Sequence, residues 1–435
     1  MRERISDLFN LRRGELAPVL IAGLFFFCIL TALMMLRPAR DALGMERGID
    51  SVRWLFIGTA LVTLLVNPVF GWMVARFRRL QFISATYAFF ALSLVGFWSL
   101  LVFAPGAVGA RSGQVFYVWF SVSNLFMTMV FWALLADRFS SDQGKRLFAL
   151  IAVGGTLGAI FGPWLAARLA EPLGTPALLL VAAGFLVLAI ALAWSLVWTR
   201  PDRAASASDV APAAEEAQRI GGSPWAGLRA VFSSPYLMGI AGYVLTMTVV
   251  ATFIYFTRLQ MVAAAESELD ARTGLLGNID MWTQVAVLVL QLTLTGQIIR
   301  RFGLAFALAA LPVATALGFV GLAVYGSFAV LIGLEAVNKA VQRGLTRPAR
   351  EALFTVIPRE DKYKAKAFID TFVYRAGDVV GAQTEGLLGR LGLALGGLVT
   401  VVVPLALFWA MLGIWLGRAQ QRKAQAIAPP GARSR

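Results

Sequence analysis

Apolar residues gather along the chain in runs of about 20, and short charged segments separate these runs. A helix of about 20 apolar residues crosses a hydrocarbon core about 30 Å thick. The runs predict twelve transmembrane helices, over residues 16–43, 54–75, 81–104, 113–136, 147–170, 176–199, 235–261, 278–299, 303–325, 328–357, 366–389 and 393–417. The pattern therefore predicts an all-α membrane protein.

One long polar stretch separates the sixth run from the seventh. Residues 200–234 are rich in Ala, Ser, Pro and Glu and show no apolar periodicity, which is typical of a flexible linker. We expect an N-terminal bundle of six helices over 1–199, a cytoplasmic linker over 200–234, a C-terminal bundle of six helices over 235–418 and a basic tail over 419–435.

Short motifs recur at a nearly constant offset between the two halves. Asp142, Lys145, Gly158 and Gly162 match Asp361, Lys364, Gly377 and Gly381, and Gly71, Arg76 and Phe77 match Gly296, Arg301 and Phe302. The paired glycines form small-residue faces on which helices pack closely in lipid. The repeat predicts two parallel six-helix halves, a 6+6 pseudo-repeat, and transporters built in this way bind substrates between their halves near the membrane midplane.

Lysine and arginine are distributed unevenly over the connections between the predicted spans. The two ends of the chain and alternate loops hold 25 of them, whereas the opposite loops hold six. Because positive residues concentrate on the cytoplasmic side, both termini are predicted to be cytoplasmic. The formal net charge of +15 does not indicate nucleic-acid binding, since these residues form no basic face on a soluble module.

Composition excludes several kinds of chemistry. The chain is 59% hydrophobic and 14% charged, it contains no histidine, and Cys28 is its single cysteine. Imidazole metal sites, serine–histidine catalysis and disulfides are therefore excluded. The sequence also contains no glycine-rich phosphate loop and no paired-carboxylate hydrolase site in a soluble module. We expect neither an enzyme nor a bound metal or cofactor.

The expected helix over 328–357 is unusual because only about ten apolar residues, 328–337, precede its charged part. The helical period gathers its polar residues on one half, namely Glu335, Asn338, Lys339, Gln342, Arg343, Thr346, Arg347 and Arg350, and leaves Val337, Ala340, Val341 and Gly344 on the other. Each Lys or Arg facing lipid at mid-depth costs about 2.5–3.5 kcal/mol. We expect this stripe to line water or to bind a partner. The alternative is internal pairing of Glu335 with Lys339 and of Glu351 with Arg347.

A heptapeptide occurs twice, as RPARDAL over 37–43 and as RPAREAL over 347–353. Each copy carries an arginine pair spaced i, i+3 and a following acid, which are Arg37, Arg40 and Asp41 in the first copy and Arg347, Arg350 and Glu351 in the second. Arginines at this spacing share a helix face, and their planar forks suit phosphate or carboxylate. The duplication indicates an anionic substrate. Alternatively, the first pair reaches the outer headgroups from the end of the first span.

The expected helix over 366–389 carries acidic residues inside the membrane. Asp370, Tyr374 and Asp378 lie near one face, and Arg375 lies beside them. Carboxylates within a membrane are candidate proton sites or counter-ions. The sequence leaves two interpretations open, a role in coupling and structural salt bridges to the arginines of 328–357.

The whole chain resembles the major facilitator superfamily in its twelve helices, its 6+6 repeat, its cytoplasmic termini and its long central loop. The loop signature of that family, roughly G-x-x-x-D-R-x-G-R-[RK], is similar to 71–80 and to 296–303, with Ala75 and Arg300 at the acidic position. The resemblance implies a transporter that works by alternating access of two bundles.

Within that superfamily the chain is most similar to the ATP/ADP translocase branch of nucleotide exchangers. Three segments carry this resemblance: 37–43, Phe131-Trp132 with 145–148, and 348–351 with 364–377. It implies nucleotide exchange, with Arg40 at the place of a basic residue that meets substrate. The chain departs from the branch where Phe120 replaces a glutamate, where no acid lies near Ile254, and where Asp378 replaces a lysine.

We expect a monomeric secondary transporter of the bacterial inner membrane that moves a small, phosphorylated organic anion of nucleotide type. The expected substrate-binding residues are Arg37, Arg40, Asp41, Lys339, Arg343, Arg347, Arg350 and Glu351. The expected coupling residues or counter-ions are Glu335, Asp370, Tyr374, Arg375 and Asp378. Cytoplasmic gate loops are expected at Arg76, Arg79, Asp142, Lys145, Arg146, Arg301, Asp361, Lys364 and Lys366. The alternatives are a proton-coupled carrier of carboxylates or peptides, a lipid translocase and a membrane receptor that transports nothing.

Overall fold

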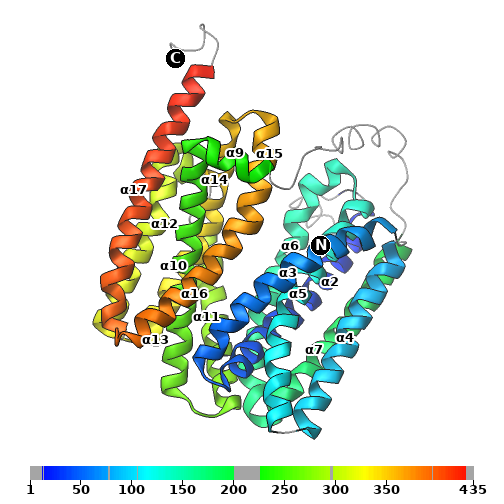
Figure 1. The fold of residues 1–435 in the computed structure, drawn as a ribbon. Coiled ribbons are helices and arrows are strands. Elements are labelled where there is room, and N and C mark those ends of the chain that lie inside the picture. Colours follow the sequence, from blue (N-terminus) through cyan, green and yellow to red (C-terminus); the bar gives the residue numbers. More distant parts are fainter. Residues whose placement is uncertain are drawn as a thin grey trace. The chain divides into compact units, whose positions relative to one another are not determined.

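The computed structural model describes residues 12, 14–76, 79–104, 106–199, 226–293, 297–393 and 395–427. These residues form a nearly all-helical protein (Figure 1). The α-helices are α2 (Leu16–Met45), α3 (Ile49–Arg76), α4 (Arg79–Phe103), α5 (Ala107–Arg138), α6 (Ser141–Leu173), α7 (Thr175–Trp198), α9 (Ala226–Ser233), α10 (Pro235–Ala265), α11 (Leu269–Thr293), α12 (Gln297–Tyr325), α13 (Phe328–Val341), α14 (Arg347–Leu353), α15 (Arg359–Phe368), α16 (Tyr374–Arg390) and α17 (Leu395–Ile427).

Among the described residues, ten helices are long and apolar enough to cross a membrane. Most of them extend several residues beyond the apolar runs, since hydropathy detects the segment within hydrocarbon and not the charged ends of a helix. The two remaining expected spans are helical but not continuously α-helical. Five-residue π-helical segments, Gln342–Thr346 and Ile369–Val373, interrupt them. The all-helical membrane fold is thus confirmed, whereas twelve spans in a 6+6 arrangement stay a prediction.

By its internal contacts the chain divides into two units. The first contains Met1–Gln218 and Val262–Trp282, and the second contains Arg219–Met261 and Thr283–Arg435. The first part of α11 therefore belongs to the first unit. The expected bundle boundaries, with a linker over 200–234 and a tail over 419–435, stay predictions, and residues 200–225 and 428–435 lie outside the described residues.

α2 lies at the centre of the first unit and packs against α5, α6 and α7. Its contact with α6 requires glycine, because a Cβ at Gly158 would lie 2.4 Å from the carbonyl oxygen of Phe27. Small residues of this kind let two backbones approach closely in a membrane. A capping box between Ser140 and Gln143 begins α6 and satisfies backbone donors at its first turn.

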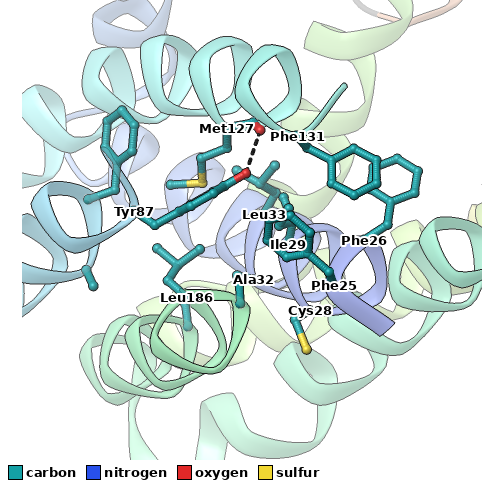
Figure 2. Close-up of a cluster of buried hydrophobic side chains, with 14 of the residues drawn as sticks. Phe25, Phe26, Cys28, Ile29, Ala32, Leu33, Tyr87, Met127, Phe131 and Leu186 are labelled. Atoms are coloured by element: carbon teal, nitrogen blue, oxygen red, sulfur yellow. Dashed lines mark hydrogen bonds between the residues drawn. The ribbon is translucent and has the colours of Figure 1, made fainter. Parts of the chain in front are cut away.

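Aromatic side chains fill the core of the first unit around α2 (Figure 2). Phe131 stacks on Phe26 with ring centroids 4.3 Å apart and meets Phe25 edge-on at 5.2 Å. The buried hydroxyl of Tyr87 donates to the carbonyl oxygen of Met127 at 2.9 Å, which satisfies a polar group that would otherwise be costly in the core. Phe131, one of the residues that carry the family resemblance, is therefore a core residue.

The second unit repeats the glycine contact of the first. A Cβ at Gly377 of α16 would lie 1.7 Å from the hydroxyl of Thr248 on α10, and one at Gly381 would lie 3.0 Å from the Cα of Val249. Gly158 and Gly162 on α6 face α2 in the same way. Both glycine pairs are thus close-packing faces, as expected, and each pair packs on the first long helix of its own unit.

Candidate functional site

Arg40 is held by its neighbours on α2 and α5. Its Nε donates to Asp41 Oδ1 at 2.8 Å, and the Asp41 side chain is fully buried. The guanidinium carbon lies 4.6 Å from the ring centroid of Tyr117 and 5.0 Å from that of Phe120, as in cation–π contacts. Phe120 is the position at which the nucleotide-exchanger resemblance would place a glutamate. Here an aromatic face takes the place of that carboxylate beside the arginine.

Arg37, one turn before Arg40, has a different environment. Its Nη1 lies 3.6 Å from Oδ1 of Asp280 on α11, within the first unit. The Asp280 side chain is 3% exposed, whereas that of Arg37 is 24% exposed. Arg37 therefore combines a buried counter-ion with an accessible side, which is what an anion-binding arginine requires.

A buried charge cluster lies in the second unit. Glu335 on α13 contacts Lys339 at 2.6 Å, one turn later on the same helix, and Arg258 Nη1 on α10 at 3.7 Å. Arg258 is completely buried. The expected pairing of Glu335 with Lys339 is confirmed. Arg258 was missed because it lies near the end of its apolar run, where a charge is unremarkable in sequence.

The π-helical segment Gln342–Thr346 changes the polar stripe of the expected helix over 328–357. A π turn accommodates one extra residue, which sets all later residues back by about 100° around the axis. Arg343, Gly344 and Arg347 are exposed together, while Val341 is buried. The expected division of this helix into a polar and an apolar half was placed with the period of a regular α-helix, which the π-helical segment interrupts, and it stays a prediction.

Arg350 and Glu351 pair with residues of the following helical segments. Arg350 Nη2 lies 3.3 Å from Asp370 Oδ1, and Lys366 Nζ lies 2.6 Å from Glu351 Oε2. The suggested pairing of Glu351 with Arg347 is thus replaced by a pairing with Lys366. Arg350 and Asp370 lie just after one π-helical segment and within the other, and such segments occur frequently at functional sites.

The acidic residues expected on 366–389 are brought close to basic partners. Asp378 accepts a hydrogen bond from Arg375 Nη1 at 3.1 Å. Tyr374 lies among the charges of Arg350, Asp370, Arg375 and Asp378. The structure thus supports ion pairing of these acids. The same helix also carries Glu385, a buried residue not selected from the sequence, whose Oε1 lies 2.5 Å from Gln260 Nε2.

The residues of the expected gate loops have varied surroundings. Arg146 contacts Glu15 at 3.0 Å, and Lys145 lies 3.8 Å from Asp142 in a highly exposed pair. Burial raises the pKa of Glu15, but hydrogen bonds from the Arg12 backbone, Arg146 and Gln143 outweigh this and hold the pKa below its usual range. Asp361 is exposed, Lys364 and Lys366 are half-buried, and the side chains of Arg76, Arg79 and Arg301 lie outside the described part of the chain.

A pocket of about 1000 Å³ lies elsewhere in the first unit, between α3, α4 and α5. Its walls are almost entirely apolar and include Leu55, Val62, Phe82, Phe89 and Trp119. None of the arginines described above lines it. A lipid translocase would need a polar groove open to lipid, and this apolar pocket does not supply one.

Comparisons with known proteins agree with this architecture. A family model described as the Major Facilitator Superfamily matches residues 19–337. ADP,ATP carrier protein 1 of Chlamydia trachomatis serovar D is 25% identical over 98% of this chain and 92% of that protein. ADP,ATP carrier protein 1 of Chlamydia pneumoniae is 22% identical over 94% of this chain and 92% of that protein.

Solved structures show the same fold at low sequence identity. The nucleoside transporter NupG (D323A mutant) is 13% identical with a TM-score of 0.62, over 93% of this chain and 99% of that one. A bacterial homologue of the iron transporter ferroportin is 14% identical with a TM-score of 0.63, over 92% and 98%. The family match covers most of the chain, and both the relatives and the structural neighbours are transporters. The chain belongs to the Major Facilitator Superfamily and is a transporter, not an enzyme.

Proposed function

We propose that this transporter exchanges phosphorylated organic anions of nucleotide type across the bacterial inner membrane, with both of its termini in the cytoplasm. Two bundles of six helices would expose the site alternately to the two sides. The names of the Chlamydia relatives, ADP,ATP carrier proteins, support a nucleotide. A single physical observation carries the proposal, namely the pair of arginine sites within apolar helical units.

In the first unit Arg37 and Arg40 lie on α2, with Asp280 and Asp41 as their acidic partners. In the second unit Arg350 pairs with Asp370. Placing such charges within a membrane is costly, and the planar guanidinium is suited to bidentate binding of phosphate. Arg37, Arg40, Arg347 and Arg350 would therefore bind oxyanions. The neighbouring Lys339 and Arg343 would add positive charge.

We assign Asp370 and Asp378 as counter-ions, because each of them contacts an arginine within 3.3 Å. A carrier that exchanges one anion for another needs no proton site, since the leaving anion balances the entering one. A proton-coupled carrier of carboxylates or peptides, the alternative function, would instead require one of these acids to bind and release a proton in every cycle.

The test is counterflow into liposomes that contain the purified protein. Vesicles loaded with unlabelled ADP should accumulate labelled ADP, and external nucleotides should compete better than sugar phosphates or dicarboxylates. Competition by dicarboxylates or peptides alone would contradict the nucleotide assignment. If no solute crosses, the transport function itself fails, and a receptor role would replace it. Movement of a fluorescent phospholipid between leaflets would favour the lipid translocase.

A further inference from the structure

Asp280 lies beside Arg37, one of the arginines proposed to bind the substrate. It belongs to α11, and its carboxylate faces Arg37 of α2 at 3.6 Å. At this separation the pair attracts through charge but makes no short hydrogen bond. A guanidinium carries five N–H donors, so Arg37 retains donors for an incoming oxyanion on its accessible side.

Three close approaches hold the first part of α11, which carries Asp280, against α6 and α7. The Asp270 carboxylate accepts a hydrogen bond from the Thr175 backbone N–H at 2.6 Å, and the hydroxyls of Thr273 and Thr175 lie 2.8 Å apart. Between them and Asp280, a Cβ at Gly277 would lie 2.8 Å from the backbone nitrogen of Ala167. The first part of α11 is thus fixed on α6 and α7, and Asp280 is a positioned counter-ion and not a flexible surface acid.

Arg40 provides a useful contrast on the same helix. It already bonds to Asp41, its neighbour in sequence, and lies over two aromatic rings. These contacts come from α2 and α5. The partner of Arg37 comes instead from α11, which is distant in sequence. The Arg37 pair thus connects a candidate substrate arginine of α2 to a helix that is distant in sequence.

We propose that Asp280 neutralises Arg37 when the site is empty and that the anionic group of the substrate displaces it from Arg37. This assignment rests on the proposed function and adds to it a residue that sets affinity. Asp280 would weaken anion binding, because the anion competes with an existing ion pair for Arg37. The buried carboxylate of Asp280 would balance the charge of Arg37 whenever no substrate is bound.

The test measures the dissociation constant of labelled ADP for the purified, full-length protein. Asp280→Asn, which keeps the shape and removes the charge, should tighten ADP binding about two- to fivefold, the range for a partly exposed ion pair. Asp280→Ala serves the same purpose if the asparagine variant does not fold. Glu268→Gln is the control, because this exposed acid lies just before the same helix and has no part in these contacts, and it should leave the affinity unchanged.

A double-mutant cycle with Arg37→Gln separates competition from simple repulsion. If Asp280 competes for Arg37, its substitution should have no effect once Arg37 is absent. Tightening that persists in the Arg37→Gln background would mean that Asp280 only repels the anion, and this would overturn the inference. Unchanged or weaker binding by Asp280→Asn would also overturn it while leaving the proposed function intact. Failure of the wild type to bind ADP, ATP or inorganic phosphate would overturn both.

Discussion

Arg350 allows a direct test of the role of an arginine pair, because its partner Asp370 lies at 3.3 Å in a neighbouring segment. Arg350→Ala should abolish ADP uptake while the protein still inserts into the membrane. Arg350→Lys should restore only part of the activity, since a point charge replaces a planar fork. Arg390→Ala, at the exposed end of α16, is the control. Wild-type uptake by Arg350→Ala would show that this arginine has only a structural role.

Glu335 and Arg258 form an ion pair with side-chain exposures of 6% and 0%. Removing one partner of a buried pair costs about 3–5 kcal/mol when the other charge is left unpaired, and Lys339, which still contacts Glu335 at 2.6 Å, reduces this cost in Arg258→Met. Arg258→Met should therefore lower the thermal unfolding midpoint clearly. Lys366→Met removes a partner of the more exposed Glu351 and should cost less than about 1 kcal/mol. The measurement is thermal unfolding of the purified variants in detergent. Equal shifts of the unfolding midpoint in Arg258→Met and Lys366→Met would contradict this ranking.

Glu15, just before α2, makes stability depend on pH. Its contacts with Arg146 and Gln143 of α6 and with the Arg12 backbone lower its folded pKa below the unfolded value of about 4.3. Its stabilising contribution is present above that value and is lost as the pH falls through the folded pKa. Wild type should unfold at a higher temperature than Glu15→Gln at pH 7, and the difference should shrink towards pH 3. A difference independent of pH would contradict this.

At the scale of helices, alanine substitutions at two glycines should have opposite effects on stability. Gly158→Ala would place a Cβ 2.4 Å from the Phe27 carbonyl oxygen and should push α6 away from α2, whereas Gly184 of α7 has no atom within 4 Å of that position. Gly184→Ala should leave stability unchanged or raise it, because alanine favours a helix interior by about 1 kcal/mol over glycine. Gly158→Ala should lower the unfolding temperature. Similar behaviour of both variants would contradict the close approach of α2 and α6.

The helices also show how far the sequence could lead. Apolar run length predicts spans such as α2 and α7 within a few residues, because transfer into hydrocarbon dominates their energy. Run length cannot predict the π-helical segments Gln342–Thr346 and Ile369–Val373. A π turn and an α turn can have the same apolar composition, so hydropathy does not distinguish them. The polar stripe of 328–357 was placed with the period of a regular α-helix, which the first of these segments interrupts.

The candidate site was predictable where a motif repeats and not where a partner is distant. The duplicated heptapeptide singles out Arg37, Arg40 and Arg350, and the structure gives each of them an acidic neighbour. Asp280 and Arg258 carry no such signal, because each lies near an end of its apolar run. Their importance comes from tertiary contacts with Arg37 and Glu335.

For the whole molecule, the central claim is that one anion must leave when another enters. Liposomes containing the protein, with equal pH on both sides, test this when they are loaded with labelled ADP or left empty. External ATP should release the label from loaded vesicles, and empty vesicles should take up little ATP. If empty vesicles instead accumulate substrate under an inward proton gradient, and Asp370→Asn or Asp378→Asn removes that dependence, exchange is contradicted and proton symport takes its place.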